Sequence, residues 1–448
     1  MEFFRRIITK NETRQAGIAM MLLLLIMYMF VHQEVARIQP SLDLLSFLPL
    51  HAMSRMELSL LDLKFILLLC GLGLLRICWP QKHFAFFVAL SSALVIGLAS
   101  PKTVFVIAAI TLLYLFPLHR LMRAAESRGW SRANSRFWLW LGIGGLVAIL
   151  FLFKLQRDII VPRLGGPSMG YDLLALVGFS YFIFRAISFL HIQAILKIDE
   201  PTPWTILSYT LFPPTITSGP IQKYQDFREQ MTNPAPLSAS LVFAAVYRIT
   251  RGYFRKAVVA FILNEAVTKL LSYRTLTILT SALVVVLLYL YFYFDFAGYS
   301  DIAIGFGLLM GIRVPENFRK PFLATTVSEF WRNWHITLVD WFRDNFFIPL
   351  GGMQSPRPRA AVLAFFTMVL AGLWHGLTLS FIAWGIWHGL LLFLEAISGV
   401  KPIPPGRRHG IGYWSRVLRT NASVAVGGIL FLPDPASILK VLNGFYNW

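Results

Sequence analysis

Two histidines of this chain, each flanked by tryptophan and glycine, are the residues best suited to chemistry. His375 lies in Gly372-Leu373-Trp374-His375-Gly376, and Trp384-Gly385-Ile386-Trp387-His388-Gly389 echoes that pattern. Glycines next to the Trp-His pair allow close backbone approach, which places one imidazole in a buried site. A neutral imidazole, with an ordinary pKa of about 6.5, suits general acid–base catalysis. Taken alone, His388 is better explained as a hydrogen-bonded packing residue.

A second concentration of polar side chains lies upstream, among very apolar neighbours. It contains His335, Arg332 and Arg343, with Trp331 four positions before His335. Charged groups in membrane segments are costly and usually functional. The bland alternatives are that the arginines reach toward lipid head groups and the tryptophans anchor the membrane interface.

The acidic residues and a metal site are weighed in the same way. Asp301 and Glu316 are expected to be helix caps or ion-pair partners rather than bases, although Asp301 is kept as a candidate substrate-binding residue. His335, His375 and His388 could converge, but no His-x3-His spacing or cysteine pair supports a metal site. We therefore predict no metal.

The sequence around His335 predicts the element that positions it. Thr326-Val327-Ser328-Glu329 fits a capping box, with Thr326 as the N-cap and Glu329 reaching back. Apolar residues then recur at three- and four-residue spacing, which predicts one amphipathic helix from Glu329 to about Asn345. In such a helix Trp331 and His335 share a face.

Composition places these elements in a membrane. The 448 residues are 56% hydrophobic and only 14% charged, with 41 Lys and Arg against 22 Asp and Glu, a net charge of +19. A soluble protein has about 25% charged residues. Long apolar runs indicate helices rather than a membrane β-barrel. The basic residues cluster in short loops, which argues against nucleic-acid binding and follows the positive-inside rule.

The apolar runs predict an all-α polytopic membrane protein with about 10–12 transmembrane or re-entrant helices. The first run, 16–31, follows a basic N-terminus and is expected to be a retained span. Loop charges place the N-terminus in the cytoplasm and the connection at residues 101–103 outside. We expect one membrane domain, divided into variable N-terminal helices (1–170), a core (171–400) and a C-terminal loop with the last helix (401–448).

The motifs, taken in order, resemble a known family. They are Tyr293–Gly305, Arg313–Phe318, Ser328–Ile336, Trp341–Asp344, Ile348–Gly352 and Leu373–Gly376, with weaker matches at 177–228. This series resembles the membrane-bound O-acyltransferases, the MBOAT family, in the bacterial branch of alginate O-acetylation and teichoic-acid D-alanyl transfer proteins. The resemblance implies helices around a central tunnel. His375 then matches the family's active-site histidine, and His335 matches the second histidine of this branch.

This resemblance implies a membrane O-acyltransferase that moves an acyl group, expected to be acetyl, from a cytoplasmic thioester to a hydroxyl. His375 would be the base, and His335 would orient the acceptor or donate to the oxyanion. Trp374 and Trp331 would shape the pocket, and Arg332 or Arg343 would hold the anionic part of the donor. No bound cofactor is expected.

The resemblance also implies the location and the partners. The chain is placed in the inner (cytoplasmic) membrane among lipids. The donor is acetyl-CoA or an acyl carrier protein, the acceptor is a cell-surface glycan, and an extracytoplasmic acyltransferase partner completes the transfer. Three other functions stay open: D-alanyl transfer to teichoic acid, a lipid-linked glycan transporter and a non-catalytic scaffold. A transporter predicts paired repeats, and none is visible in the sequence.

Overall fold

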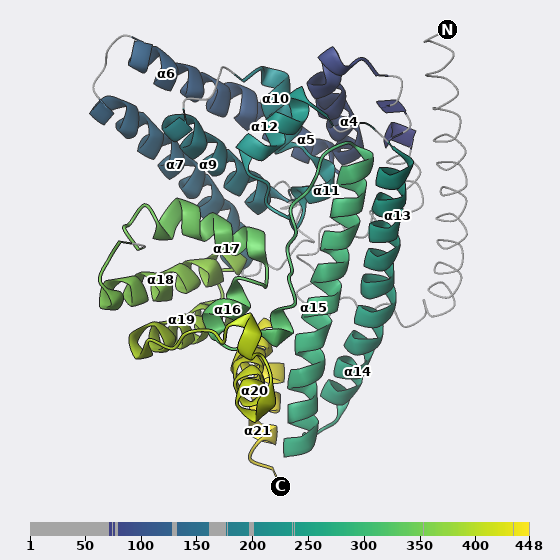
Figure 1. Ribbon diagram of the computed structural model, residues 1–448, viewed down its shortest axis with the longest axis vertical. Helices are drawn as coiled ribbons and strands as arrows, with labels where there is room; N and C mark the ends of the chain where they lie inside the picture. Colours follow the sequence, from purple (N-terminus) through teal and green to yellow (C-terminus); the bar gives the residue numbers. More distant parts are fainter. Residues whose placement is uncertain are drawn as a thin grey trace.

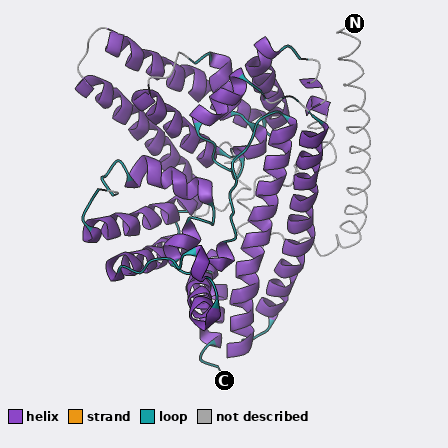
Figure 2. Cartoon of the chain, in the orientation of Figure 1, coloured by secondary structure: helices purple, strands orange, loops and turns teal. Residues whose placement is uncertain are grey.

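A computed structural model of the chain describes residues 71–127 (without 74, 77 and 78), 132–160, 176, 178–196 and 201–447 (without 235, 237, 353 and 433). These residues form helices joined by loops (Figures 1 and 2). Within them the β-structure is limited to an isolated bridge between Phe318 and Trp334. The all-α fold predicted from the sequence is therefore confirmed.

The N-terminal half of the described chain forms one group of helices, in the upper part of Figure 1. Ser100 begins the second of them by accepting a hydrogen bond from the Thr103 amide, and Pro101 takes the first helical position, where no amide donor is needed. The group comprises α4 (Phe84–Ala99), α5 (Pro101–Ile110), α6 (Phe116–Ser127), α7 (Arg132–Leu155), α9 (Phe179–Leu196), α10 (Pro203–Thr210), α11 (Pro213–Ile216) and α12 (Tyr224–Thr232), with π-helical segments η4 (Thr111–Leu115) and η5 (Gln156–Ile160).

The C-terminal half follows a pair of long helical stretches and fills the lower part of Figure 1. The first stretch comprises α13 (Ala239–Tyr253), η8 (Phe254–Ala260) and α14 (Phe261–Ser272), which pack along α15 (Ile278–Leu309). The later helices are α16 (Val327–Trp331), α17 (Ile336–Phe342), α18 (Arg357–His375), α19 (Leu379–Ser398), α20 (Gly410–Gly428) and α21 (Pro435–Gly444).

Helix α15 joins the two groups. It is 32 residues long and unites the apolar runs 277–294 and 298–312, which are separate in the sequence pattern. Asp295 of this helix forms an ion pair with Lys256 at 2.7 Å. The pair offsets the desolvation cost of a carboxylate between apolar helical turns. Side chains from its C-terminal part belong to the core of the first helix group, and those from its N-terminal part belong to the core of the second. Both helix groups therefore pack on one shared element.

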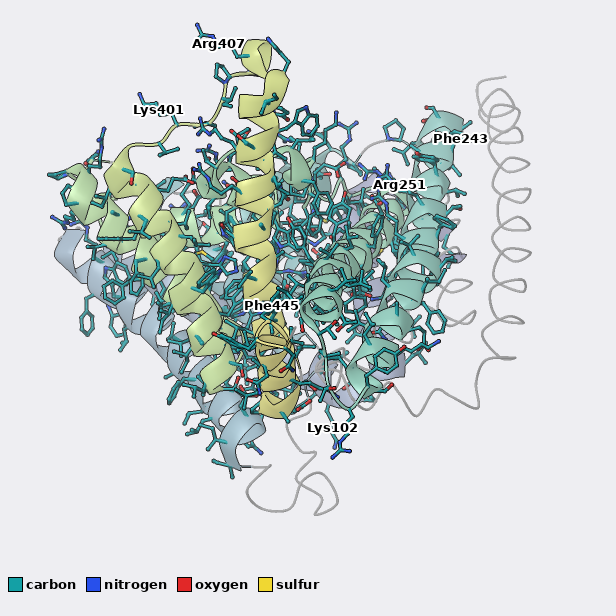
Figure 3. All side chains as sticks on the ribbon, turned by 90° about the horizontal axis from the view of Figure 1, so that it is seen from below. Lys102, Phe243, Arg251, Lys401, Arg407 and Phe445 are labelled. Carbon is teal, nitrogen blue, oxygen red and sulfur yellow. The ribbon has the colours of Figure 1, made fainter. Side chains whose placement is uncertain are left out.

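Within the part of the chain that the structure describes, five helical stretches are long and apolar enough to cross a membrane: Pro101–Ala124, Arg136–Ile160, Ile278–Leu309, Arg357–His375 and Leu379–Ser398. Many large apolar side chains are exposed on the outside of these helices, as expected for lipid contact. The chain is thus a membrane protein. The expected first span at 16–31 lies outside the described residues. Figure 3 shows Lys401 and Arg407 at one edge of the molecule and Lys102 at the opposite edge.

Candidate active site

A tightly packed pair of helices, α18 and α19, positions His375. Glycines make the close packing possible, because a Cβ at Gly385 would lie 2.7 Å from the carbonyl oxygen of Met368, and one at Gly372 would collide with the carbonyl oxygen of Phe381. Residues 376–378 join the two helices, and His375 is the last residue of α18. The close backbone approach predicted around this Trp-His pair is therefore present.

Aromatic rings enclose the imidazole of His375. The ring centroids of Trp374, Trp384 and Phe431 lie 4.7, 5.1 and 5.0 Å from its own. The imidazole forms no hydrogen bond with any residue that the structure describes. Such a ring is held by apolar packing while both of its nitrogens keep their capacity to bind a substrate or a proton.

Three further polar groups around His375 lack hydrogen-bond partners among the described residues. The indole N–H groups of Trp331 and Trp374 and the Nδ1 atom of His388 are buried without a hydrogen-bond partner among the described residues. Trp331 lies 5.6 Å from Trp384 and 5.0 Å from His388, measured between ring centroids. Buried polar groups are normally satisfied, so unpaired ones indicate a place for water or a ligand. We call Trp331, Trp374, His375, Trp384, His388 and Phe431 the aromatic cluster.

The prediction that His388 is a hydrogen-bonded packing residue is only half right. Its side chain is buried and packs against Trp331 and Trp384. Its Nδ1 atom, however, has no hydrogen-bond partner in the described chain. His388 therefore adds an unpaired polar atom to the site rather than closing a local network.

The single helix predicted from Glu329 to about Asn345 is wrong. The chain forms α16, breaks at residues 332–335, and resumes as α17 and the π-helical segment η10 (Arg343–Phe347). His335 sits at the break with a left-handed backbone, φ +46°. The bridge between Phe318 and Trp334, and the hydrogen bond from the Ile336 amide to the Asn317 carbonyl, compete with helical bonding there.

The break separates two side chains that were expected to share a face. Trp331 joins the aromatic cluster, whereas His335 packs edge-on against Phe296 at 4.5 Å between ring centroids. Nδ1 of His335 donates to the amide oxygen of Asn317 at 3.2 Å, and the Thr337 hydroxyl donates to the same oxygen at 2.9 Å. This bonding fixes the tautomer and leaves Nε2 as the acceptor.

Burial holds His335 in its neutral form. Burial lowers the pKa of His335 well below its ordinary value, and electrostatic repulsion from His375 lowers that pKa further. The two predicted histidines contact different neighbours, since His335 lies at the break between α16 and α17 and His375 ends α18.

The predicted capping box is half formed. The Thr326 hydroxyl accepts a hydrogen bond from the Glu329 amide at 3.1 Å, as expected for an N-cap. The Glu329 carboxylate does not return to the N-cap amide. It binds the amide and hydroxyl of Thr325, both at 2.8 Å, and pairs with Arg408 at 2.5 Å. Glu329 therefore ties the loop before α20 to the start of α16.

Asp301 is the centre of an ion-pair network. Arg248, Arg251 and Arg255 approach its carboxylate at 2.5, 2.5 and 2.7 Å, and Arg248 also contacts Glu316. Asp301 is buried in α15, and the arginines come from α13 and η8. The expectation of an ion-pair partner is confirmed for both acidic residues. The carboxylate of Asp301 is occupied by protein groups, which gives no support to a substrate-binding role.

The two candidate donor-binding arginines lie on the surface of the described structure. Arg332 is exposed, and its side chain forms no hydrogen bond or ion pair with a described residue. Arg343 pairs with Asp340 at 2.6 Å and with Asp344 at 2.9 Å. Neither arginine forms a hydrogen bond or a cation–π contact with a described residue of the aromatic cluster. Their donor-binding role therefore remains a prediction.

The sequence analysis missed three charged residues that contact the loop after His375. Lys154 and Arg157 donate to the carbonyl oxygen of His375, at 3.5 and 3.4 Å, and Asp158 accepts from the Leu377 amide at 2.9 Å. They lie at the end of α7 and in η5. A signal for them is present in the sequence, because charged residues at the end of an apolar run are costly in a membrane and usually functional.

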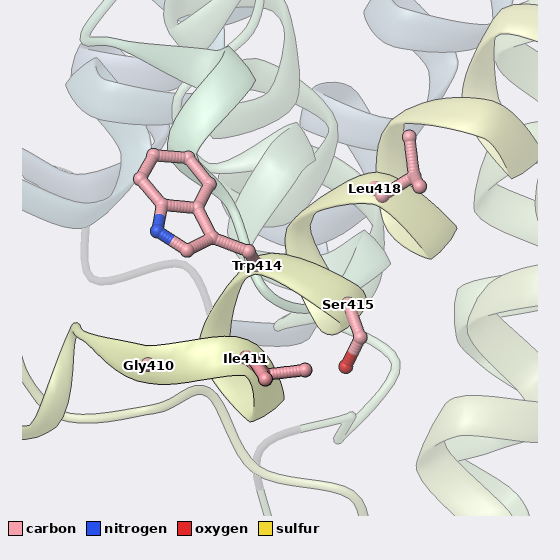
Figure 4. Close-up of a pocket in the computed structure, with 5 residues that line it drawn as sticks. All are labelled: Gly410, Ile411, Trp414, Ser415 and Leu418. Carbon is pink, nitrogen blue, oxygen red and sulfur yellow. The ribbon is translucent and has the colours of Figure 1, made fainter.

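One surface hollow, of about 500 Å³, lies over the first turns of α20 (Figure 4). Its lining is Gly410, Ile411, Trp414, Ser415 and Leu418, which includes a single hydroxyl and no titratable side chain. None of the predicted site residues lines it. We therefore place the candidate active site at His375 and not at this hollow.

Comparison with known proteins identifies the class to which this fold and site belong. Residues 171–400, half of the chain, match the model of the MBOAT, membrane-bound O-acyltransferase family. The chain belongs to this family, as the motifs predicted. The matched range coincides with the expected core and contains His335, His375 and the aromatic cluster up to His388.

Individual relatives agree with this assignment. The chain is 32% identical over 325 residues to a probable alginate O-acetylase of Pseudomonas putida, covering 69% of this chain and 65% of that protein. It is 30% identical to a teichoic acid D-alanyltransferase of Bacillus subtilis (56% and 66%) and 29% identical to a peptidoglycan O-acetyltransferase of Helicobacter pylori (56% and 54%). The matched part thus spans between half and two thirds of these relatives.

Proposed function

We propose that this protein is a membrane O-acyltransferase that transfers an acyl group, most simply acetyl, from a thioester to a hydroxyl. The observation that carries the proposal is the environment of His375. Its imidazole is packed between aromatic rings and free of described hydrogen bonds, and two unpaired indole N–H groups lie in the same cluster. Membership of the MBOAT family and the names of the relatives support the same reaction class.

The proposed chemistry uses groups present in this site. His375 takes the proton of the acceptor hydroxyl while the oxygen attacks the thioester carbonyl. The carbon–sulfur bond then breaks, and the proton passes from the imidazolium to the departing thiolate. The unpaired indole N–H groups of Trp331 and Trp374 are suited to hydrogen-bond the developing oxyanion, which needs preorganised donors in a dry environment. His335, neutral and fixed by Asn317, orients the reacting groups.

The donor and acceptor follow from location. We propose that the donor is a cytoplasmic thioester, acetyl-CoA or an acyl carrier protein, and that a tunnel through the helices lets its acyl group cross the inner membrane. The acceptor would be a cell-surface glycan, reached directly or through an extracytoplasmic acyltransferase partner. Three relatives are named for alginate, teichoic acid and peptidoglycan, and these names support a glycan or a related envelope polymer as the proposed acceptor.

The test is the ester content of isolated cell-surface polymers from cells that carry wild type or His375→Ala at equal membrane abundance. Loss of a general base lowers the rate by about 10²–10⁴-fold, so the ester should fall below detection. His83→Ala is the matched control, because His83 is exposed and lies outside the site. Wild-type ester levels in His375→Ala would refute catalysis at this residue and favour a transporter or scaffold.

The same experiment separates acetyl from D-alanyl transfer. Mild alkaline hydrolysis releases the acid from the ester, and its identity, acetate or D-alanine, names the acyl group. Release of acetate that depends on His375 supports the proposal as stated. Release of D-alanine would keep the acyltransferase reaction and correct the acyl group.

A further inference from the structure

The C-terminal end of α18 is bound by charged residues from a distant part of the sequence. The carbonyl oxygen of His375 accepts from Lys154 at 3.5 Å and from Arg157 at 3.4 Å. Two residues further along the chain a negatively charged group binds the backbone, because the Leu377 amide donates a hydrogen bond to Oδ2 of Asp158 at 2.9 Å. Both sides of Gly376 are therefore tied to η5 and the end of α7.

The burial and charge of these residues make the arrangement costly. Lys154 is 4% exposed, and the Asp158 side chain is 9% exposed. Arg157 is 39% exposed and pairs with Asp158 at 2.5 Å. A buried ammonium and a buried carboxylate lose much hydration free energy, which is recovered only by well-directed partners. Their partners here are the backbone groups on either side of the catalytic candidate.

The local backbone fits the same purpose. The last four carbonyl groups of a helix lack intrahelical donors, and cations are favourable there because of the helix dipole. Gly376 follows His375 with extended backbone, so α18 ends abruptly at the histidine. Arg157 and Asp158 belong to the π-helical segment η5, a kind of element often found at functional sites, and Lys154 lies in the last turn of α7 just before it.

We propose that Lys154, Arg157 and Asp158 are positioning residues for His375, and we call them the clasp. The clasp fixes the backbone from His375 to Leu377 and so holds the imidazole at the angle that proton transfer to and from the substrate requires. This inference rests on the acyl transfer proposed above. The aromatic rings limit where the imidazole lies, whereas the clasp sets the direction in which it leaves the backbone.

Substitution of the clasp residues distinguishes a positioning role from that of a simple helix cap, because the two roles predict different effects on protein amount and on activity per molecule. A cap that contributes only stability would lower the amount of folded protein and leave each molecule fully active. Loss of a positioning residue leaves the protein folded and lowers the rate per molecule, since a displacement of about 1 Å costs about 100-fold in rate.

The experiment compares Asp158→Leu with Asp158→Asn in the full-length protein. Asparagine keeps an oxygen that accepts the Leu377 amide, whereas leucine has none. We expect Asp158→Leu to lower the surface ester content per copy at least about tenfold and Asp158→Asn to retain most of it. Lys154→Met and Lys154→Gln form a second pair with the same logic. Arg136→Gln, on the exposed far end of α7, is the control.

Hydrogen–deuterium exchange of the purified proteins provides the readout that is independent of activity. Exchange of peptides covering residues 373–380 should be faster in Asp158→Leu and Lys154→Met, with the rest of the chain unchanged, and near wild type in the conservative variants. If a leucine or methionine variant does not accumulate, Arg157→Gln gives a milder change, because Arg157 is partly exposed.

Two results would overturn the clasp. Wild-type ester content with accelerated exchange at 373–380 would show that the loop does not need fixing. Lost ester with unchanged exchange there would show that these residues act elsewhere. Failure of the proposed function is separate, because His375→Ala would then keep its ester content whatever the clasp variants do.

Discussion

At the scale of single residues, the site divides the work between backbone and side chain. The carbonyl of His375 accepts hydrogen bonds from charged donors of α7 and η5, while its imidazole packs against aromatic rings. His335 shows the reverse arrangement, because its imidazole is hydrogen-bonded to Asn317 and its backbone takes the strained left-handed conformation. One histidine is thereby left free to react, and the other is fixed.

The neutral state of His335 leads to a prediction about pH. Burial lowers its pKa in the folded protein, so below about pH 6.5 the unfolded chain binds a proton that the folded chain does not. Stability contributed by this residue is thus lost as pH falls, by up to about 1.4 kcal/mol per pH unit. We expect His335→Asn, which tolerates φ +46° and does not titrate, to reduce the slope of melting temperature against pH between 6.5 and 5. Equal slopes would contradict this account.

Asp301 leads to a second prediction at this scale. Asp301→Asn leaves three guanidinium groups facing each other, and it should cost roughly 2–3 kcal/mol, less than for a fully buried pair because the arginines are 22–30% exposed. Glu316→Gln is the matched control, since Glu316 contacts the same Arg248 but is 47% exposed. Thermal unfolding in detergent measures both. If Asp301→Asn instead keeps its stability and weakens donor binding, Asp301 is a substrate residue after all.

At the scale of elements, the helix pair α18–α19 determines where His375 lies. The helices approach through glycines, and a methyl group at Gly372 would meet the Phe381 carbonyl oxygen and the Gly385 Cα. We expect Gly372→Ala to separate the helices, cost about 1–3 kcal/mol and displace Trp374 and His375, lowering ester formation more than protein abundance. Gly144→Ala is the control, because nothing lies within 4 Å of its added Cβ and alanine favours helix. Equal effects of the two changes would refute the close-packing argument.

The element that carries His335 marks the limit of prediction from local patterns. Apolar spacing after Glu329 is helical, and both α16 and α17 are helical. The break between them arises from residues 317 and 318, which are near in space and remote in the helical pattern. Periodicity records which residues face the core, but it carries no information about a neighbouring strand-like segment that takes over the backbone hydrogen bonds.

At the scale of the whole molecule, the fold class and the His375 motif are predictable from the sequence because both depend on local patterns. Apolar run length and the Gly-Trp-His-Gly spacing are local properties of the sequence. The clasp was not predictable, because Lys154 and His375 are 221 positions apart and no local pattern pairs them. The same holds for Asp301 in α15, whose three arginines come from α13 and η8. Long-range pairing of charges in an apolar protein is set by how the helices pack.

Orientation in the membrane gives the last prediction. Loop charges predict that the connection at 101–103 lies outside, and Figure 3 shows Lys401 and Arg407 at the opposite edge of the molecule from Lys102. We therefore expect the loop that contains Lys401 and Arg407 to be cytoplasmic. In a chain carrying Cys70→Ala and Cys78→Ala, Lys102→Cys should react with an impermeant maleimide in right-side-out vesicles, and Arg407→Cys should react only after permeabilisation.

The labelling result tests from which side the proposed cytoplasmic donor would reach the site. Both positions are exposed, so accessibility on either side depends on the membrane and not on burial in the protein. Labelling of Arg407→Cys alone would reverse the orientation and place the loop outside. Labelling of both from outside would mean that Lys102 and Arg407 share a face, contrary to their separation across the fold. Only the expected pattern leaves the basic 401–407 loop on the side where an anionic acyl carrier is available, since opposite charge favours encounter there.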